Sequence, residues 1–136
     1  MVSAGKKKIY RIPVWKGDLY NKRKILFAGD SAGQVLPLSY EGIYYALKAG
    51  NLAARAIMEG KAGDYKKMWK ARFQKRFILL DKLKNFFLKD NDSVERLLRL
   101  QRRPEVQEVS LMLWFRKDSR PQSLFHYLKL FGKFLS

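Results

Sequence analysis

The sequence contains no cysteine and only one histidine, and each absence excludes a class of protein chemistry. Without cysteine there can be no disulfides, no thiolate nucleophile and no cysteine-ligated zinc. With His126 as the only imidazole, a metal site built from several histidines is excluded as well. No apolar run approaches the roughly 20 residues that a membrane-spanning helix needs, so no transmembrane helix is predicted.

Acidic residues are also scarce, and the charge balance points to an anionic partner. The chain has 29 Lys and Arg against 12 Asp and Glu, a net charge of +17. Such a field attracts phosphate on nucleic acids, lipid head groups or cofactors. The basic start, residues 1–8, does not lead into the apolar segment of a signal peptide. We therefore expect a cytoplasmic protein that meets a membrane, if at all, only at its surface.

The length of 136 residues allows one domain or part of one, and the pattern predicts a mostly helical chain with a short β segment. The apolar run Lys24–Ala28 is too short for a helix and predicts a strand buried on both faces, as in a parallel sheet. Helices are expected at residues 43–59, 64–89, from Asp92 to Leu100, from Pro104 and from Gln122. Gly60 would end the first of these helices, and Asp92 with Glu95 resembles a capping box at the start of the third. Two strands do not make a stable sheet alone, which suggests part of a larger fold.

The predicted helix at residues 64–89 carries a stripe of large apolar side chains. They recur at spacings of three and four, so the stripe must face a core or a partner. Its members are Tyr65, Trp69, Phe73, Phe77, Leu80, Leu83 and Phe87.

Residues 24–60 carry the most informative pattern. The predicted strand delivers Gly29 and Asp30 to its carboxyl end, where ligands of open α/β sheets bind. Asp30 offers two acceptors for sugar-type hydroxyls, and the helix start at Gly42 and Ile43 presents unpaired N–H groups. Because Gly42 lacks a Cβ, a flat ligand can approach its backbone closely. This arrangement fits a flavin, although an ordinary strand–loop–helix turn with a capping acid has the same ingredients.

The complete spacing closely resembles the second FAD motif of the geranylgeranyl reductase family, flavoproteins of the p-hydroxybenzoate-hydroxylase type. The matching residues are Gly29-Asp30-Ser31-Ala32-Gly33, Pro37, Glu41-Gly42-Ile43, Ala46 and Gly50. The resemblance implies that Asp30 binds the ribityl hydroxyls of FAD, that Pro37 lies near the isoalloxazine, and that Gly42 and Ile43 supply amides at the helix start. Two residues depart from the family pattern: Ser31 stands where Ala is usual, and Tyr40 where Gly is common.

The resemblance also implies an incomplete protein, because the residues before Gly29 contain no Gly-x-Gly-x-x-Gly unit for the ADP half of FAD. Residues 1–60 would be the remnant of an α/β, Rossmann-like FAD-binding domain, and residues 61–136 a basic helical carboxyl-terminal region. Either a separate chain supplies the amino-terminal half, or the gene is split or degenerate. The completed enzyme would reduce C=C bonds of prenyl lipid chains by hydride transfer from reduced FAD.

Two other functions stay open at this point. Gly29-Asp30-Ser31-Ala32-Gly33 also satisfies Gly-x-Ser-x-Gly, the nucleophile elbow of α/β-hydrolases, with Ser31 as nucleophile and His126 as base. Pro37 opposes this hypothesis, because it falls where the helix after the elbow needs a backbone N–H. The basic helices could instead form a non-enzymatic module that binds an anionic membrane surface or nucleic acid. No base-reading motif is present, so a membrane is the favoured surface of the two.

Overall fold

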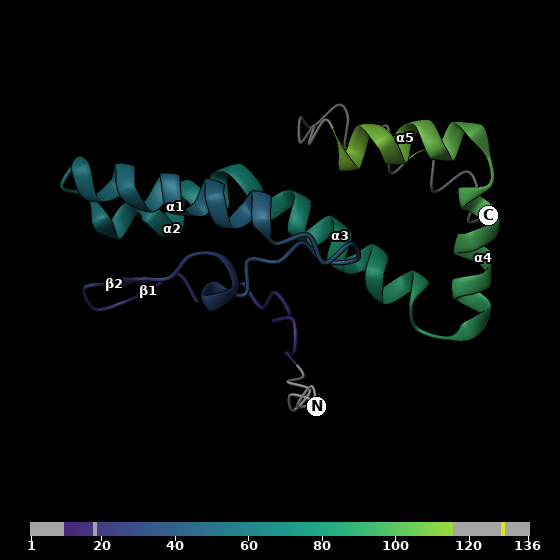
Figure 1. Ribbon diagram of the computed structural model, residues 1–136, viewed down its shortest axis with the longest axis horizontal. Helices are drawn as coiled ribbons and strands as arrows, with labels where there is room; N and C mark the ends of the chain where they lie inside the picture. The colour runs from purple at the N-terminus through teal and green to yellow at the C-terminus, as the bar shows by residue number, and fades with distance from the viewer. Residues whose placement is uncertain (1–9, 18, 116–128, 130–136) are drawn as a thin grey trace, which may run out of the picture. The chain divides into compact units, whose positions relative to one another are not determined.

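The computed structural model describes residues 10–17, 19–115 and 129 (Figure 1). Most of the described residues are helical, and the sheet among them has two strands, which confirms the predicted mostly helical chain with a short β segment. The chain forms two compact units, residues 1–65 and 66–136. The predicted helix from Gln122 lies outside the described residues.

The first unit contains a small hairpin, a short turn of helix and one long helix. Strands β1 (Asn21–Lys22) and β2 (Ile25–Leu26) pair antiparallel, with Asn21 opposite Leu26. The three-ten turn η1 (Gly29–Ala32) follows, and a loop leads to helix α1 (Ile43–Met58) and a second three-ten turn, η2 (Ala62–Asp64). Turn η1 packs against helix α1. The buried core of this unit includes Tyr20, Val35, Leu36, Tyr45, Ala49, Leu52, Ala56 and Tyr65.

The prediction of a parallel strand buried on both faces is wrong for the described residues. The apolar run at residues 24–28 pairs only with β1, in antiparallel register, and Ile25 is 60% exposed. An antiparallel pair needs only a short turn between its strands, whereas a parallel neighbour needs a long crossover connection. Here the turn is Arg23–Lys24, so the run pairs with the segment just before it and nothing in the described chain covers the Ile25 side chain.

Helix α1 ends where the sequence predicts. The amide of Gly60 donates to the carbonyl of Ile57 (3.0 Å) and that of Lys61 to the carbonyl of Ala56 (2.8 Å). These two bonds form a Schellman motif, which requires a left-handed residue at its centre. Gly60 provides it with a φ of +68°, and glycine adopts this conformation without steric cost.

The predicted long helix is present, but it is not uniformly α-helical. Helix α2 (Tyr65–Trp69) passes into a π-helical segment, η3 (Lys70–Gln74), and then into α3 (Lys75–Phe87). All but one of the predicted apolar stripe residues are buried, and Leu83 is partly buried. The prediction that the stripe faces a core is therefore confirmed.

The π-helical segment explains how side chains four residues apart stay on one face. Tyr65, Trp69, Phe73 and Phe77 are all buried. In an ideal α-helix each step of four residues rotates the side chain by roughly 40° beyond a full turn, so three steps would drift by roughly 120°. A π-helical turn adds one residue and removes most of this drift. The Trp69 ring consequently packs against both Phe73 and Phe77, with centroids 5.7 and 5.0 Å away.

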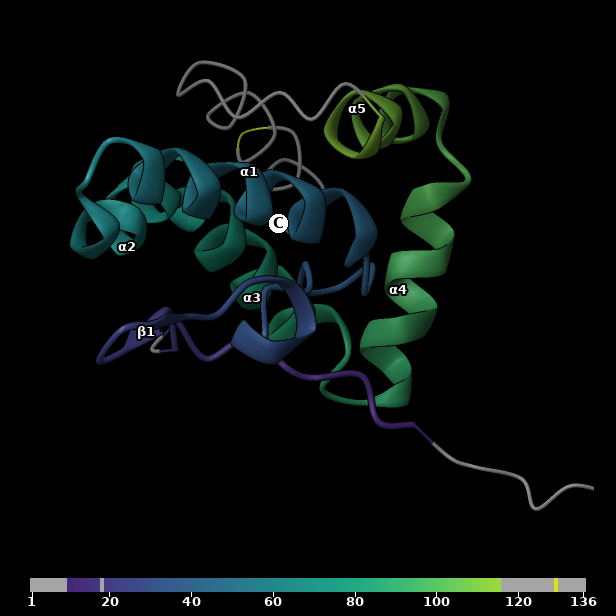
Figure 2. The same cartoon turned by 60° about the vertical axis from the view of Figure 1, so that its left-hand side comes forward.

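Two short helices complete the second unit. Helix α4 (Asn91–Gln101) is capped by Asp90, whose carboxylate accepts from the Ser93 amide at 2.8 Å, and not by Asp92 as the sequence suggested. Helix α5 (Pro104–Trp114) begins with the predicted proline in its first turn. Figures 1 and 2 both show a sharp bend between α4 and α5. Phe87, Leu100 and Val106 form a buried cluster where α3, α4 and α5 meet.

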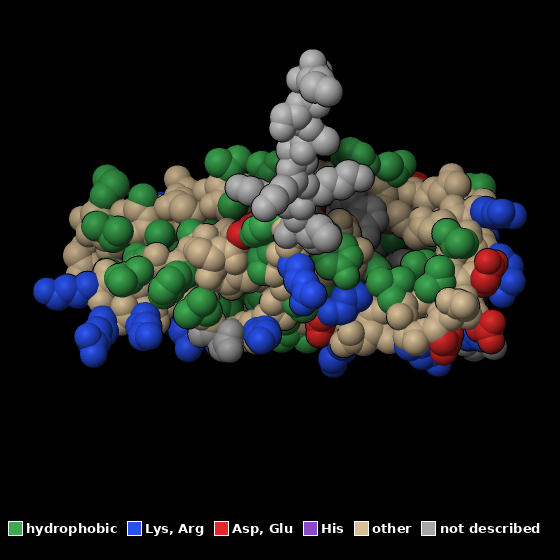
Figure 3. Space-filling model, turned by 60° about the horizontal axis from the view of Figure 1, so that its bottom comes forward, with side chains coloured by type: hydrophobic (Ala, Val, Ile, Leu, Met, Phe, Trp, Pro, Cys, Tyr) green, Lys and Arg blue, Asp and Glu red, His purple; other side chains and the backbone are tan. Residues whose placement is uncertain are grey.

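On the face of the molecule seen in Figure 3, many hydrophobic side chains are interspersed with Lys, Arg, Asp and Glu. Exposed examples include Leu98 on α4 and Leu111 on α5. No group of three or more His, Asp or Glu residues able to hold a metal ion occurs among the described residues. Within the same part of the chain, no helix is both long enough and apolar enough to cross a membrane.

Candidate functional site

The candidate site begins at Gly29, where the chain turns sharply after the hairpin. Gly29 has a φ of +64°, and a Cβ placed on it would lie 2.8 Å from the Cβ of Ala46 in α1. Carbon atoms do not approach this closely, so any side chain here would push the turn away from the helix. The absence of a side chain at Gly29 thus brings η1 into contact with the first turns of α1.

A buried hydrogen-bond network holds the turn at Gly29 in place. The Gly29 amide donates to the side-chain oxygen of Gln34 at 2.9 Å, and the Gln34 amide donates to the Gly29 carbonyl at 3.0 Å. The Gln34 side-chain nitrogen donates to the Tyr65 hydroxyl (3.0 Å), which donates in turn to the Phe27 carbonyl (2.8 Å). Burial raises the pKa of the Tyr65 hydroxyl, so the group stays protonated and able to donate.

Sequence reasoning missed Gln34 and the hydroxyl of Tyr65 as parts of the site. The only signal was a glutamine just before the apolar residues Val35 and Leu36, which Gln34 joins in the core at 1% exposure. A buried amide must be hydrogen-bonded, but its partner lies 31 positions away, which no local pattern reveals.

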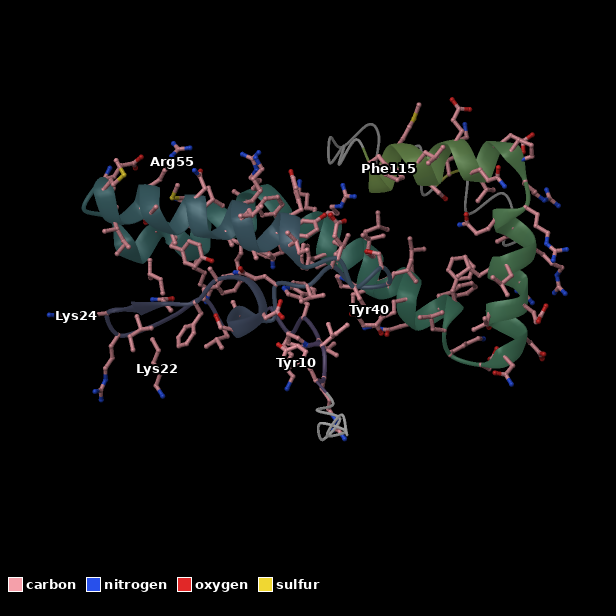
Figure 4. All side chains as sticks on the ribbon, viewed as in Figure 1. Tyr10, Lys22, Lys24, Tyr40, Arg55 and Phe115 are labelled. Carbon is pink, nitrogen blue, oxygen red and sulfur yellow. The ribbon has the colours of Figure 1, made fainter. Side chains whose placement is uncertain are left out.

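The Asp30 carboxylate lies at the start of helix α1. Its Oδ1 is 3.3 Å from the position that a Cβ on Gly42 would take. Its Oδ2 accepts a hydrogen bond from the hydroxyl of Tyr10, at 3.1 Å (Figure 4). This bond and the nearby negative charge raise the pKa of Tyr10, since they favour the neutral phenol. The carboxylate is exposed and already accepts from a hydroxyl group.

The backbone N–H groups of the first turn of α1 have no capping side chain in the described chain. Gly42 stands at the N-cap, and in the described chain no side chain caps this helix and no acidic residue occupies its first turn. The amides that begin a helix have no intrahelical acceptor, and the helix dipole makes them attractive to negative charge. Because Gly42 has no side chain, these amides and the Asp30 carboxylate are close neighbours.

The loop between η1 and α1 is not a helix. Gly33 adopts a φ of +59°, and a Cβ on it would lie 3.1 Å from the Val14 carbonyl oxygen. Two backbone bonds close the rest of the loop: the Leu36 amide donates to the Glu41 carbonyl (2.9 Å) and the Tyr40 amide to the Leu36 carbonyl (3.0 Å). Pro37 is buried within it. The loop therefore returns the chain to the Asp30 side before α1 begins.

Tyr40 has a φ of +55° and Leu38 a φ of +76°. Left-handed backbone costs a residue with a side chain about 1–2 kcal/mol, whereas glycine adopts it freely. This conformation explains why Gly is common at the Tyr40 position in the pattern that the sequence resembles. The Tyr40 ring is 47% exposed (Figure 4), so it projects from the loop and does not fill its interior.

The geometry does not favour the hydrolase alternative. A nucleophile elbow continues directly into a helix, but η1 ends after four residues at Gly33. The Ser31 hydroxyl donates to the Ala28 carbonyl at 2.8 Å and so stabilises the turn itself. His126, the base of that hypothesis, lies outside the described residues.

Of the predicted binding residues, the structure brings together Gly29, Asp30 and Gly42. Gly29 lies against Ala46 of α1, and the Asp30 carboxylate is 3.3 Å from the position that a Cβ on Gly42 would take. Ile43 follows as the first residue of α1 and is 81% exposed. Pro37 is in the same loop but buried. The carboxylate and the helix start therefore converge as expected, while the ligand that they would hold stays a prediction.

Comparisons with known proteins find several reductases named for geranylgeranyl compounds. Geranylgeranyl diphosphate reductase of Rhodobacter capsulatus is 33% identical over 115 residues, covering 78% of this chain and 29% of that protein. The chloroplastic geranylgeranyl diphosphate reductase of Arabidopsis thaliana is 29% identical over 119 residues, covering 79% and 26%. Digeranylgeranylglycerophospholipid reductase of Methanococcus aeolicus is 29% identical over 118 residues, covering 76% and 29%.

No family model and no solved structure matches the chain. The chain spans less than a third of the length of these three curated relatives. Three reductases that act on geranylgeranyl compounds, from a bacterium, a plant and an archaeon, nevertheless match more than three quarters of it. By this similarity, the chain is related to the geranylgeranyl reductase family.

Proposed function

We propose that this chain forms the flavin-ring side of an FAD-dependent reductase that acts on the C=C bonds of prenyl lipid chains. The observation that carries the proposal is the 3.3 Å approach of the Asp30 carboxylate to the Cβ position of Gly42 at the start of α1. The names of the relatives indicate reduction of geranylgeranyl groups. The amino-terminal portion of such a reductase, which the relatives carry outside the matched region, would complete the FAD site.

The residues of the site fit the ring and ribityl part of FAD. The ribityl chain carries hydroxyl groups, and Asp30 is exposed and already accepts from the hydroxyl of Tyr10. The edge of the isoalloxazine that includes its N1 and C2 carbonyl gains negative charge on reduction, and the uncapped start of α1 favours negative charge. Gly42 leaves room for a flat ring at this helix start. Bound FAD would supply hydride chemistry that no side chain here provides.

Each residue has a distinct part in this proposal. Asp30 would hold the ribityl hydroxyls and so fix the ring in register with α1. The Gly42 and Ile43 amides would face the electron-rich edge of the ring, and Pro37 would shape the loop beside it. Gly29 and Gln34 act indirectly, because they hold η1 against α1 and thereby place the Asp30 carboxylate.

Flavin retention by an Asp30→Ala variant tests the proposal. The chain would be co-expressed with the part of the Rhodobacter capsulatus reductase that lies outside its match to this chain, and bound flavin would be measured by its visible absorbance after gel filtration. We expect the parent assembly to retain flavin and Asp30→Ala to lose it. Glu59→Ala is the matched control, because Glu59 is an exposed acid in the same unit that pairs with the exposed Arg55 at 3.9 Å. Equal retention by Asp30→Ala and Glu59→Ala would refute the role of Asp30.

A further inference from the structure

The hydroxyl of Tyr10 reaches the Asp30 carboxylate from a segment 20 positions earlier in the chain. It donates to Oδ2 of Asp30 at 3.1 Å. Tyr10 precedes the β1–β2 hairpin and Asp30 follows it, so the hairpin returns the chain to the Tyr10 segment. Tyr10 was not among the site residues that the sequence predicted, because no local pattern links positions 10 and 30.

The segment that carries Tyr10 lies against the turn that carries Asp30. Gly33 follows η1, and a Cβ on it would lie 3.1 Å from the carbonyl oxygen of Val14 and 3.7 Å from the Cα of Trp15. The backbone at Val14 and Trp15 therefore passes directly over the end of η1. Tyr10 stands only four residues before this contact, so the packing at Gly33 keeps its hydroxyl within reach of Asp30.

The two oxygens of the Asp30 carboxylate have different neighbours. Oδ1 lies 3.3 Å from the position that a Cβ on Gly42 would take, and Oδ2 accepts from Tyr10. The Asp30 side chain is exposed, and an exposed side chain can exchange between several staggered rotamers. A hydrogen bond to a carboxylate is stronger than one between neutral groups. The bond to Tyr10 therefore favours the rotamer that keeps Oδ1 at the start of α1.

The bond to Tyr10 leaves the carboxylate able to accept from a ligand as well. An ionised carboxylate has about four acceptor positions on its two oxygens, and the hydroxyl of Tyr10 uses one of them. A ligand hydroxyl beside the start of α1 would thus meet an acceptor that is already oriented. Orienting a group before binding lowers the entropy that binding must cost. A ligand without hydroxyl groups would gain nothing from this orientation.

We propose that Tyr10 is a positioning residue, which holds the Asp30 carboxylate with Oδ1 at the start of α1 and so makes the site prefer flavins that carry ribityl hydroxyls. Tyr10 acts through Asp30 and needs no contact with the flavin ring. This inference rests on the proposed function, because it takes the ligand to be a flavin.

Two flavins that share one ring system test the proposal. Riboflavin carries the ribityl chain, whereas lumiflavin has a methyl group in its place. Each is titrated by fluorescence into the full-length chain assembled with the portion of the Rhodobacter capsulatus reductase outside the match. We expect Tyr10→Phe to weaken riboflavin binding by about three- to tenfold, the effect of one hydrogen bond, and to leave lumiflavin binding unchanged. The matched control is Tyr40→Phe, which removes another exposed hydroxyl from the same unit and should change neither affinity.

A second measurement needs no flavin. Carboxyl-carbon NMR of the full-length chain reports the environment of the Asp30 side chain directly. Tyr10→Phe should shift the Asp30 signal, and Tyr40→Phe should not. An Asp30 signal that is the same in the parent and in Tyr10→Phe would overturn the proposal, because the hydroxyl of Tyr10 would then not orient the carboxylate.

The outcomes separate this inference from the proposed function. Riboflavin binding that is lost in Asp30→Ala but unchanged in Tyr10→Phe would overturn the role of Tyr10 and leave the flavin site standing. Tighter riboflavin binding by Tyr10→Phe would also overturn it, since Tyr10 would then compete with the ligand for Asp30. Equal weakening of riboflavin and lumiflavin would show a purely structural role and overturn the positioning role. A parent assembly that binds neither flavin would overturn the proposed function and this inference together.

Discussion

A glycine-to-alanine series tests how the turn at Gly29 positions the site. Gly29 combines a left-handed φ of +64° with a Cβ position only 2.8 Å from the Ala46 Cβ. Gly60 has a similar φ of +68° but no atom within 4 Å of its Cβ position. Gly50 lies inside α1, at a negative φ, and is equally open. The three sites therefore separate backbone strain, steric overlap and helix propensity.

The magnitudes follow from these differences. Alanine in left-handed backbone costs about 1–2 kcal/mol, so Gly60→Ala should lower the free energy of unfolding by about 1 kcal/mol after the reduced entropy of the unfolded chain is counted. Gly29→Ala carries the same term plus overpacking of about 1–3 kcal/mol, a total of about 2–4 kcal/mol. Gly50→Ala should raise the free energy of unfolding by about 0.5–1 kcal/mol, because alanine is the better helix former.

Urea denaturation followed by far-ultraviolet circular dichroism measures all three variants on the same full-length chain. The predicted order of stability is Gly50→Ala above the parent, then Gly60→Ala, then Gly29→Ala. If Gly29→Ala were no less stable than Gly60→Ala, η1 would not be pressed against Ala46. Gly29 would then not be the residue that holds the Asp30 carboxylate at the start of α1.

The remaining predictions concern two hydrogen-bonded side chains. Tyr65→Phe should lower the free energy of unfolding by about 1–3 kcal/mol, because it leaves the buried Gln34 amide and Phe27 carbonyl without a partner; the control Tyr40→Phe, at a 47% exposed ring, should change little. Burial raises the pKa of Tyr65. The stability that its neutral hydroxyl contributes is therefore fully present below the ordinary tyrosine pKa of about 10 and is lost as pH rises through the higher folded value. The parent should lose stability at alkaline pH more steeply than Tyr65→Phe. The Ser93 hydrogen bonds lower the pKa of Asp90, so its capping contribution is present above the unfolded pKa of about 4 and is lost as pH falls through the lower folded value. In thermal melts, Asp90→Ala should be less stable than the parent at neutral pH and equal to it in acid. Asp90→Asn should be close to the parent at neutral pH. Equal melting temperatures for all three proteins at neutral pH would contradict the capping role of Asp90.

Local patterns in the sequence predicted the helices well. The Ala-rich segment followed by Gly60 predicted the ends of α1 to within one residue, and the apolar stripe of α2 and α3 is buried as expected. The π-helical segment was not predicted, because the expected helical pattern assumes the same number of residues per turn along the whole helix. The run of four-residue steps from Tyr65 to Phe77 is the signal in the sequence that indicates it. The cap of α4 was misplaced by two residues, because Asp90 and Asp92 are equally good capping residues in sequence.

The site was predictable only where its parts are close in sequence. The fixed order of Gly29, Asp30 and Gly42 indicated a carboxylate near a helix start, and the structure places them together. The Gln34–Tyr65 hydrogen bond joins residues 31 positions apart, and such pairings depend on tertiary packing that no periodicity encodes. The prediction of a parallel strand buried on both faces was wrong for a related reason. An apolar composition indicates burial but does not identify the segment with which the strand pairs. The side chains of Ile25 on β2 and of Leu47 and Met58 on α1 are apolar and mostly exposed in the described chain.

The measurement that tests the central claim most directly is the response of backbone amides to flavin. The isotope-labelled chain, assembled with the unlabelled remaining portion of the Rhodobacter reductase, would be observed by amide NMR before and after addition of FAD. The proposal predicts that the amide signals of Asp30, Gly42 and Ile43 shift on binding, while that of Gly60, at the other end of α1, does not. Bound flavin with unchanged signals at Asp30, Gly42 and Ile43 would contradict the claim that the carboxylate and the helix start hold the ring.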